Sequence, residues 1–358
     1  MDIDKASLTE RALRPNAWIA GSELAILAGP PTVADCSEPA YALHPGRTQE
    51  RFGTDMAGLF ATLDKPPVSV RPYLLHDTLL LGCGHIVVSR GAFLLESKYL
   101  NPDLDKRIAL SLRDPVLDLD PETVWIVGGN ASMKNYWHWL AQSLPAIAHC
   151  TAWLRELGAR KIGLITPELQ PYQRESLRLA GLAPAEVVEL TVFRSARAAH
   201  CAYSPFLSGA AAFTPSAYRR AVREAMLANA GIGTGSGPRR LFLSRRDSRK
   251  RPLHNEAEVI ACLAEFGFVT VCPGTMPVAE QVRTFARADL VVAPHGAGSA
   301  NYLFMRPGSR VLELQQQALV NAGPLSLCKT AGTQAWVEIF PDSVPGEADA
   351  GWRADIPV

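Results

Sequence analysis

The sequence lacks a marked excess of charge of either sign. It has 358 residues, with 36 Lys and Arg against 35 Asp and Glu, which leaves a formal net charge of +1. Proteins that bind nucleic acid or acidic membrane surfaces usually carry a larger positive excess, so overall charge favours neither class. The composition, 47% hydrophobic and 20% charged, is typical of a soluble globular chain with material for two or more domains.

Cysteine is sparse and irregularly spaced. The seven cysteines form no CxxC pair and their number is odd, which argues against a disulfide framework and against a structural zinc site. This usage favours a reducing compartment. The cysteines are Cys36, Cys83, Cys150, Cys201, Cys262, Cys272 and Cys328.

Long apolar runs are absent as well. No stretch approaches the roughly 18 apolar residues of a membrane-spanning helix. The start, Met1–Lys5, is polar and acidic with no apolar segment behind it, so the pattern predicts neither a signal peptide nor a transmembrane segment. We expect a cytoplasmic protein and leave open a peripheral contact with the inner face of the membrane.

Four common catalytic motifs are missing: GxSxG, HExxH, the phosphate-binding P-loop and a GxGxxG after a predicted strand. Two Asp-x-Asp pairs, Asp103–Asp105 and Asp118–Asp120, have a form that can hold Mg²⁺ or Mn²⁺ on a diphosphate. Each lies in a connecting segment rich in Asp and Pro rather than at the end of a predicted strand. We therefore expect no metal site.

The sequence does contain a repeated alternation of short apolar runs and helical patterns. Between residues 68 and 95 β-prone runs are separated by glycines, which predicts a small antiparallel meander. After residue 121 strands alternate with helices, which indicates βαβ units and a largely parallel sheet. Four glycines within Gly231–Pro238 mark a linker. The predicted segments are a β-rich lead (1–120), a first Rossmann-like domain (121–230), the linker (231–238), a second Rossmann-like domain (239–345) and a tail (346–358).

The clearest predicted strand–turn–helix unit lies in the second domain. The apolar run Leu290–Ala293 ends in a Pro-His-Gly turn, and a helical pattern follows at once. The first N–H groups of such a helix have no partners, and glycines let an anion approach them. The turn residues His295, Gly296, Ala297 and Gly298 are therefore candidates for binding a phosphate. The alternative is a packed turn in which His295 bonds to a backbone carbonyl.

A basic segment follows the first predicted strand of that domain, Leu241–Leu243. Between Arg239 and Arg251 seven basic residues accompany one acid, Asp247. Arginine suits bidentate contact with phosphate oxygens, and Arg245 is the first arginine after the strand. Arg245 is our candidate for a diphosphate ligand, whereas most of the segment is expected to be solvated.

Two further polar positions lie in apolar surroundings. Glu313 lies within the predicted strand Arg310–Leu314, where a carboxylate must be paired or hydrogen-bonded. It could bind a ribose or sugar hydroxyl, or pair with an arginine. On the predicted helix Asn135–Cys150, His138 and Gln142 share a polar face that could be open to solvent or line a cleft. In a cleft, a neutral His138 could take a proton from a hydroxyl.

An ordered series of short motifs runs through the second half of the chain. Its pieces are Ser244-Arg245, Asn255-Glu256, Gly267-Phe268, Glu280-Gln281, Ala288-Asp289, His295-Gly296-Ala297-Gly298, Asn301, Phe304-Met305 and Pro307 to Glu313. Upstream, Asn135-Tyr136-Trp137-His138-Trp139 is followed by Leu144-Pro145. The series resembles glycosyltransferase family 61, and the resemblance covers residues 123–315. One departure is Ser299-Ala300, where the family often has Leu-Thr.

The resemblance implies an α/β chain of the GT-B type, with two Rossmann-like domains facing a cleft and an inverting mechanism without an essential metal. It implies a nucleotide sugar, with UDP as the expected carrier, and an acceptor hydroxyl on a glycan or lipid-linked molecule, but no nucleic acid. Arg245 and the His295 turn would hold the diphosphate, and His138 would be the catalytic base. Further donor-site residues carried over from the family are Asn255, Gln281, Asn301 and Glu313. Lacking an anchor and disulfides, the chain looks like a bacterial member that makes a capsule or exopolysaccharide.

Two other functions are compatible with the same donor site. A GT-B-like epimerase or hydrolase would act on the nucleotide sugar without an acceptor. A non-catalytic protein would bind the nucleotide sugar and leave it unchanged.

Overall fold

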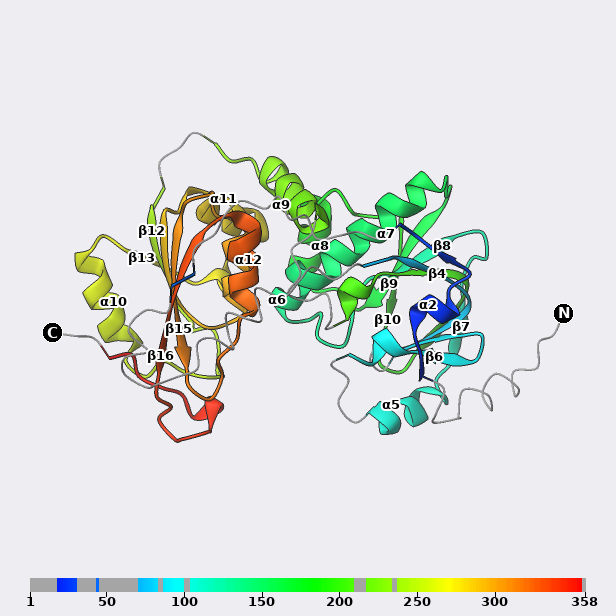
Figure 1. The fold of residues 1–358 in the computed structure, drawn as a ribbon, viewed down its shortest axis with the longest axis horizontal. Coiled ribbons are helices and arrows are strands. Elements are labelled where there is room, and N and C mark those ends of the chain that lie inside the picture. The colour runs from blue at the N-terminus through cyan, green and yellow to red at the C-terminus, as the bar shows by residue number, and fades with distance from the viewer. Residues whose placement is uncertain are drawn as a thin grey trace. The chain divides into compact units, whose positions relative to one another are not determined.

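The computed structural model describes residues 18–30, 43–44, 70–82, 86–99, 104–208, 217–233 and 237–355. The chain divides into two compact units, and both combine helices with strands (Figure 1). One unit consists of residues 1–33 and 68–212, the other of residues 34–67 and 213–358. Cys36, Cys83, Asp103, residues 234–236 of the expected linker and most of the expected irregular region 1–65 lie outside the described residues.

The described strands of the first unit form a ten-stranded mixed sheet in the order β1-β6-β5-β4-β11-β8-β9-β10, with β2 beside β4 and β7 beside β11. The expected antiparallel meander is present as β4, β5 and β6. It belongs to the same sheet as the parallel strands, because β11 pairs antiparallel with β4 and parallel with β8. The bounds are β1 Trp18–Ile19, β2 Leu27–Ala28, β4 Tyr73–Leu81, β5 Ile86–Ser89, β6 Ala92–Leu94, β7 Val116–Asp118, β8 Val124–Val127, β9 Ile162–Pro167, β10 Glu186–Leu190 and β11 Ser195–Tyr203.

The long helix expected over Asn135–Cys150 is present, but it contains a π turn. The N–H of Leu144 reaches the carbonyl of Trp139, five residues back instead of four. This wide turn separates two helical segments, and its buried side chains include Trp139 and Gln142. The helical segments of the unit are α2 Gly21–Leu24, η1 Leu95–Lys98, α5 Leu104–Ser111, α6 Tyr136–His138, the π turn η2 Trp139–Ser143, α7 Leu144–Glu156, α8 Pro171–Leu179 and η3 Pro205–Leu207.

The described strands of the second unit form a parallel sheet in the order β13-β12-β14-β15-β16-β3. The strand β12 has β13 on one side and β14 on the other. The order in which strands are added to the sheet therefore reverses at β12. In such sheets ligands bind beyond the carboxyl ends of the strands, at the point where the order reverses. The bounds are β3 Leu43–His44, β12 Arg240–Leu243, β13 Val269–Val271, β14 Leu290–Pro294, β15 Arg310–Gln316 and β16 Gln334–Phe340.

The helices of the second unit follow the expected alternation with one difference, since the segment after the His295 turn is a 3-10 helix, η6. The helix α12 begins at Gly323, with Pro324 in its first turn. None of the described helices is long and apolar enough to cross a membrane. The segments are α9 Ala217–Asn229, α10 Glu256–Glu265, η5 Pro273–Thr275, α11 Val278–Arg287, η6 Ala297–Phe304, α12 Gly323–Ala331 and η7 Ala348–Ala350.

Candidate functional site

The predicted phosphate-binding residues meet at the carboxyl ends of β12 and β14. Arg245 lies two residues beyond the end of β12, and His295 directly follows β14. The two strands are parallel neighbours, with Phe242 opposite Val292. Their ends therefore reach the same edge of the sheet, at the position where the strand order reverses.

Arg245 and Gly296 are in very close approach. The Nη1 of Arg245 donates to the carbonyl of His295 at 2.6 Å, and its Nη2 donates to the carbonyl of Lys250 at 3.0 Å. A Cβ placed on Gly296 would lie 1.5 Å from Nη1 of Arg245. The φ of Gly296 is 176°, an extended value that any residue can adopt. A side chain at position 296 would displace the guanidinium from this contact.

Burial lowers the pKa of Arg245 to about 10, with a further contribution from the positive charge of Arg251. A guanidinium with that pKa is still charged at neutral pH. Its Nε is buried and has no hydrogen-bond partner among the described residues. A buried cationic donor of this kind is costly unless a ligand completes its hydrogen bonds.

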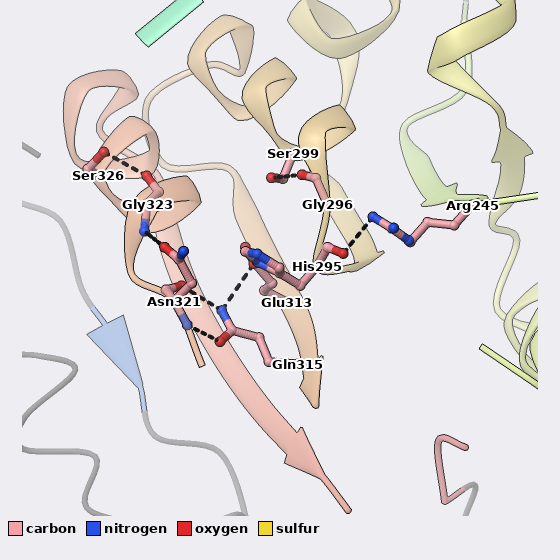
Figure 2. A network of polar contacts seen from close by, with 9 residues as sticks. All are labelled: Arg245, His295, Gly296, Ser299, Glu313, Gln315, Asn321, Gly323 and Ser326. Atoms are coloured by element: carbon pink, nitrogen blue, oxygen red, sulfur yellow. Dashed lines mark hydrogen bonds and ion pairs between the residues drawn. The ribbon is translucent and has the colours of Figure 1, made fainter. Parts of the chain in front are cut away.

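His295 is paired with Glu313, which is fully buried. The Nδ1 of His295 lies 2.7 Å from Oε1 of Glu313, whose exposed fraction is 0%. The Nε2 of Gln315 donates to the same oxygen at 3.1 Å and to the carbonyl of Asn321 at 2.9 Å. Figure 2 shows this network, with Arg245 reaching the carbonyl of His295. The partner of Glu313 is thus a histidine, and not the arginine that the sequence suggested as a protein partner.

The pairing with Glu313 determines which nitrogen of His295 is available. A carboxylate only accepts hydrogen bonds, so Nδ1 of His295 carries the hydrogen. The Nε2 atom is then left for a ligand. Behind the pair lies Tyr302, whose pKa is raised well above its ordinary value by burial, with the charge of Glu313 adding to the effect. Tyr302 therefore remains a neutral phenol beside the carboxylate.

Two predicted donor-site residues support the turn from inside the unit. The Nδ2 of Asn301 donates to Oε1 of Gln281 at 2.8 Å and to the carbonyl of Gly298 at 3.0 Å. The Nε2 of Gln281 donates to the carbonyl of Met276 at 3.0 Å. Both side chains are buried, and Ser299 also donates to the carbonyl of Gly296. These contacts hold the backbone of the turn.

Asn255, which comes just before α10, contacts the C-terminal segment instead of the His295 turn. Its Nδ2 donates to the carbonyl of Ala354 at 2.7 Å, and its Oδ1 accepts from the N–H of Ala354 at 3.0 Å. Glu256, which sequence reasoning did not select, accepts the backbone N–H of Arg245 at 3.1 Å. Its place beside Asn255 in the motif series was the available signal. The donor-binding role of Asn255 stays a prediction.

His138 lies in the first unit and takes part in a separate chain of hydrogen bonds. Its Nδ1 lies 2.7 Å from Oε1 of Gln142, and the same oxygen accepts from Nδ2 of Asn130 at 3.2 Å. Gln142 is fully buried and His138 is half-buried. The polar face expected on this helix therefore lies largely inside the protein. Burial lowers the pKa of His138, partly offset by the hydrogen bond to Gln142.

The comparison with family models is decisive for the class of protein. The model described as Glycosyltransferase 61 matches residues 136–312. This match, which covers just under half of the chain, supports a glycosyltransferase. A search of curated proteins found no match.

The matched segment begins at α6 and ends within β15. It contains His138, Arg245 and the turn from His295 to Gly298, whereas Glu313 follows its last matched residue. The protein is a glycosyltransferase, so its partners include a sugar donor and an acceptor. Among the residues that the structure describes, no three His, Cys, Asp or Glu side chains are grouped as they would be around a metal ion.

Proposed function

We propose that the protein is an inverting, metal-independent glycosyltransferase of the GT-B type. It moves a sugar from a nucleotide sugar to a hydroxyl of a glycan or lipid-linked acceptor. The observation that carries this proposal is the contact between Arg245 and the backbone of His295 at the carboxyl ends of β12 and β14. It supports a diphosphate site at the place where open α/β sheets bind their ligands.

The diphosphate is the group whose charge grows as the sugar leaves. Arg245 supplies a fixed positive charge and the unpartnered Nε–H, and the first N–H groups of η6 have no acceptor within their helix. Glu313 fixes the orientation of the His295 ring at the end of β14. Donors fixed in advance stabilise developing charge without reorganisation, which is the task that a metal performs in other transferases.

His138 has the features that a general base requires. The hydrogen bond from Asn130 shows that the Gln142 atom beside His138 is the amide oxygen, which only accepts. Nδ1 of His138 therefore carries the hydrogen, and Nε2 keeps its lone pair. Burial lowers the pKa of His138, so the imidazole is neutral at pH 7. In a GT-B arrangement the first unit would present this atom to the acceptor hydroxyl.

The proposed reaction is a single displacement. The acceptor oxygen forms a bond to the anomeric carbon while the bond from that carbon to the diphosphate oxygen breaks. The acceptor proton moves to Nε2 of His138, and the bonding electrons leave with the nucleoside diphosphate. One displacement inverts the configuration at the anomeric carbon.

The test is turnover with a panel of nucleotide sugars and acceptors in the presence of EDTA, with the product anomer assigned by NMR. We expect an inverted product, and we expect His138→Gln to lower kcat at least a hundredfold while donor KM changes little, because general-base catalysis contributes about 10²–10⁴. A retained configuration, or activity that requires a divalent metal, would contradict the mechanism. Conversion of the donor without any acceptor would indicate an epimerase or hydrolase instead.

A further inference from the structure

A cavity of the second unit lies at the edge of the parallel sheet opposite the Arg245 turn. Its volume is about 710 Å³, and it opens at the amino ends of β12, β14 and β15. β14 has five residues and rises roughly 16 Å, so the cavity and the Arg245 turn are separated by about the length of a strand. The lining residues are Arg239, Arg240, Asp289, Leu290, Arg306, Pro307, Gly308, Ser309 and Arg310.

The register of the sheet places two of these arginines on the same face. Leu290 of β14 is opposite Arg240 of β12 and also opposite Arg310 of β15. Residues opposite one another in a sheet project to the same side, and neighbouring strands are about 4.8 Å apart. Arg240 and Arg310 therefore start about 10 Å from each other at the backbone, on either side of an apolar side chain.

A tight turn fixes a third arginine at the rim. The N–H of Ser309 bonds to the carbonyl of Arg306 at 3.1 Å, and Gly308 has a φ of 80°. Pro307 at the second position and glycine with positive φ at the third are the features of a type II turn. Pro307 and Gly308 therefore favour the turn that fixes the backbone position of Arg306.

The single acid of the cavity leaves most of the positive charge uncompensated. The carboxylate of Asp289 is shared between Arg239, at 2.6 Å from its Nε, and Arg306. Arg240 donates to the neutral carbonyl of Phe266. Arg310 is exposed and makes no side-chain hydrogen bond or ion pair within the described part of the chain. Four arginines and one carboxylate give the cavity a formal charge of +3.

We propose that this cavity is a second binding site, separate from the donor site, for a phosphoryl anion with two or more negative charges. Arginine forks match the oxygens of a phosphoryl group, and several arginines around one cavity favour a multiply charged ligand over a single carboxylate. A volume of about 710 Å³ is within the range of small-ligand sites. The phosphoryl group can belong to a soluble di- or polyphosphate or to the headgroup of a lipid.

The experiment has one arm for each source of the phosphoryl group. Calorimetric titration with inorganic pyrophosphate is done in a full-length Arg245→Ala chain, so that the proposed donor site does not contribute. Co-sedimentation is done with wild-type protein and vesicles of phosphatidylcholine, with and without phosphatidylglycerol. Both arms are repeated after adding Arg240→Gln and Arg310→Gln. The matched control adds Arg113→Gln and Arg178→Gln, two exposed positions of the first unit that remove the same charge.

We expect affinity in at least one arm to fall tenfold or more in the Arg240→Gln, Arg310→Gln chain and to be unchanged in the control. A fall with pyrophosphate identifies a soluble ligand, and a fall confined to phosphatidylglycerol vesicles identifies a lipid headgroup. Equal affinities of test and control chains in both arms, or no binding in either, would overturn the proposal. Arg310→Gln alone replaces the double change if melting curves show that the latter impairs folding.

Discussion

The guanidinium of Arg245 lies against Gly296, just beyond the end of β14. The guanidinium occupies the space where any other residue at position 296 would carry its Cβ. Gly298 is different, because a Cβ there would lie 3.6 Å from its nearest neighbour, the Cγ of Pro273. The two glycines of one motif therefore have different physical roles, and only the first is required by Arg245.

Gly296→Ala is expected to raise the donor KM about tenfold or more. The new methyl group displaces the guanidinium of Arg245 from the carbonyl of His295, and a charge-assisted hydrogen bond contributes about 1.5–3 kcal/mol. Steady-state kinetics over a donor series measure the change. Gly233→Ala, outside the turn, is the control and should change KM less than about threefold, because the nearest atom to its new methyl group is 4.0 Å away. Equal effects of the two substitutions would show that the contact with Arg245 is not the reason for Gly296.

The pairing of His295 with Glu313 marks the limit of what the sequence predicts at this scale. Each residue could be selected alone, one as a polar residue at a strand end and the other as a carboxylate among apolar neighbours. Their contact depends on the register of β14 and β15, in which Ala293 lies opposite Glu313. His295, two residues beyond Ala293, projects to the same side. Nothing local in the sequence specifies that register.

Among the elements, α10 is tied to the C-terminal segment by Asn255. Its side chain both donates to and accepts from the backbone of Ala354, and these groups are buried. We expect Asn255→Ala to lower the free energy of unfolding by about 1–3 kcal/mol, because buried backbone groups lose their partners. Donor KM should stay within about twofold when folded protein is counted.

Urea unfolding and donor kinetics, run side by side, measure the two effects of Asn255→Ala. Glu265→Gln is the control, since it changes an exposed residue at the other end of the same helix. A large rise in donor KM with unchanged stability would instead support the donor-binding role expected for Asn255 from the family resemblance.

The packing of α7 against η3 makes stability depend on pH. His149 of α7 is buried, bonds through Nδ1 to Ser204 at 3.0 Å, and has its pKa lowered by burial from 6.5 to about 4. Between pH 6.5 and 4 the unfolded chain takes up a proton that the folded protein does not. The neutral His149 therefore makes its full contribution to stability above pH 6.5. The free energy of unfolding falls by about 3 kcal/mol as the pH drops from 6.5 to 4.

Urea titrations between pH 7 and 4 measure this dependence. His149→Gln should remove about 3 kcal/mol of the difference between pH 7 and pH 4, whatever its effect at pH 7. The same pH dependence in the wild-type and His149→Gln chains would mean that His149 is not the group that titrates.

Most regular elements of the second half were predictable because their apolar period is clear. The expected strands Leu241–Leu243 and Leu290–Ala293 match the observed β12 and β14 to within one residue. The π turn at Trp139–Ser143 and the 3-10 form of η6 were not predictable, since both depend on backbone hydrogen bonds that side-chain spacing does not encode.

At the scale of the whole molecule, the pairing of strands that are far apart in the sequence was not predictable. The sequence pattern around β4 is a series of short β-prone runs, whereas the pattern around β8 alternates strands and helices. The strand β11 nevertheless pairs with both β4 and β8 in one sheet. In the second unit the alternation predicted a parallel sheet, whereas its order could not be read from the pattern. That order, with β12 between β13 and β14, brings Arg245 to the His295 turn.

The central claim is that Arg245 and the His295 turn hold the diphosphate of the donor without a metal. The most direct measurement is the thermal stabilisation of the full-length protein by a panel of nucleoside diphosphates and nucleotide sugars in EDTA, because a ligand stabilises the folded state by mass action. We predict that at least one raises Tm in EDTA and that Arg245→Gln abolishes the shift. Stabilisation that needs a divalent metal, or that persists in Arg245→Gln, would contradict the claim.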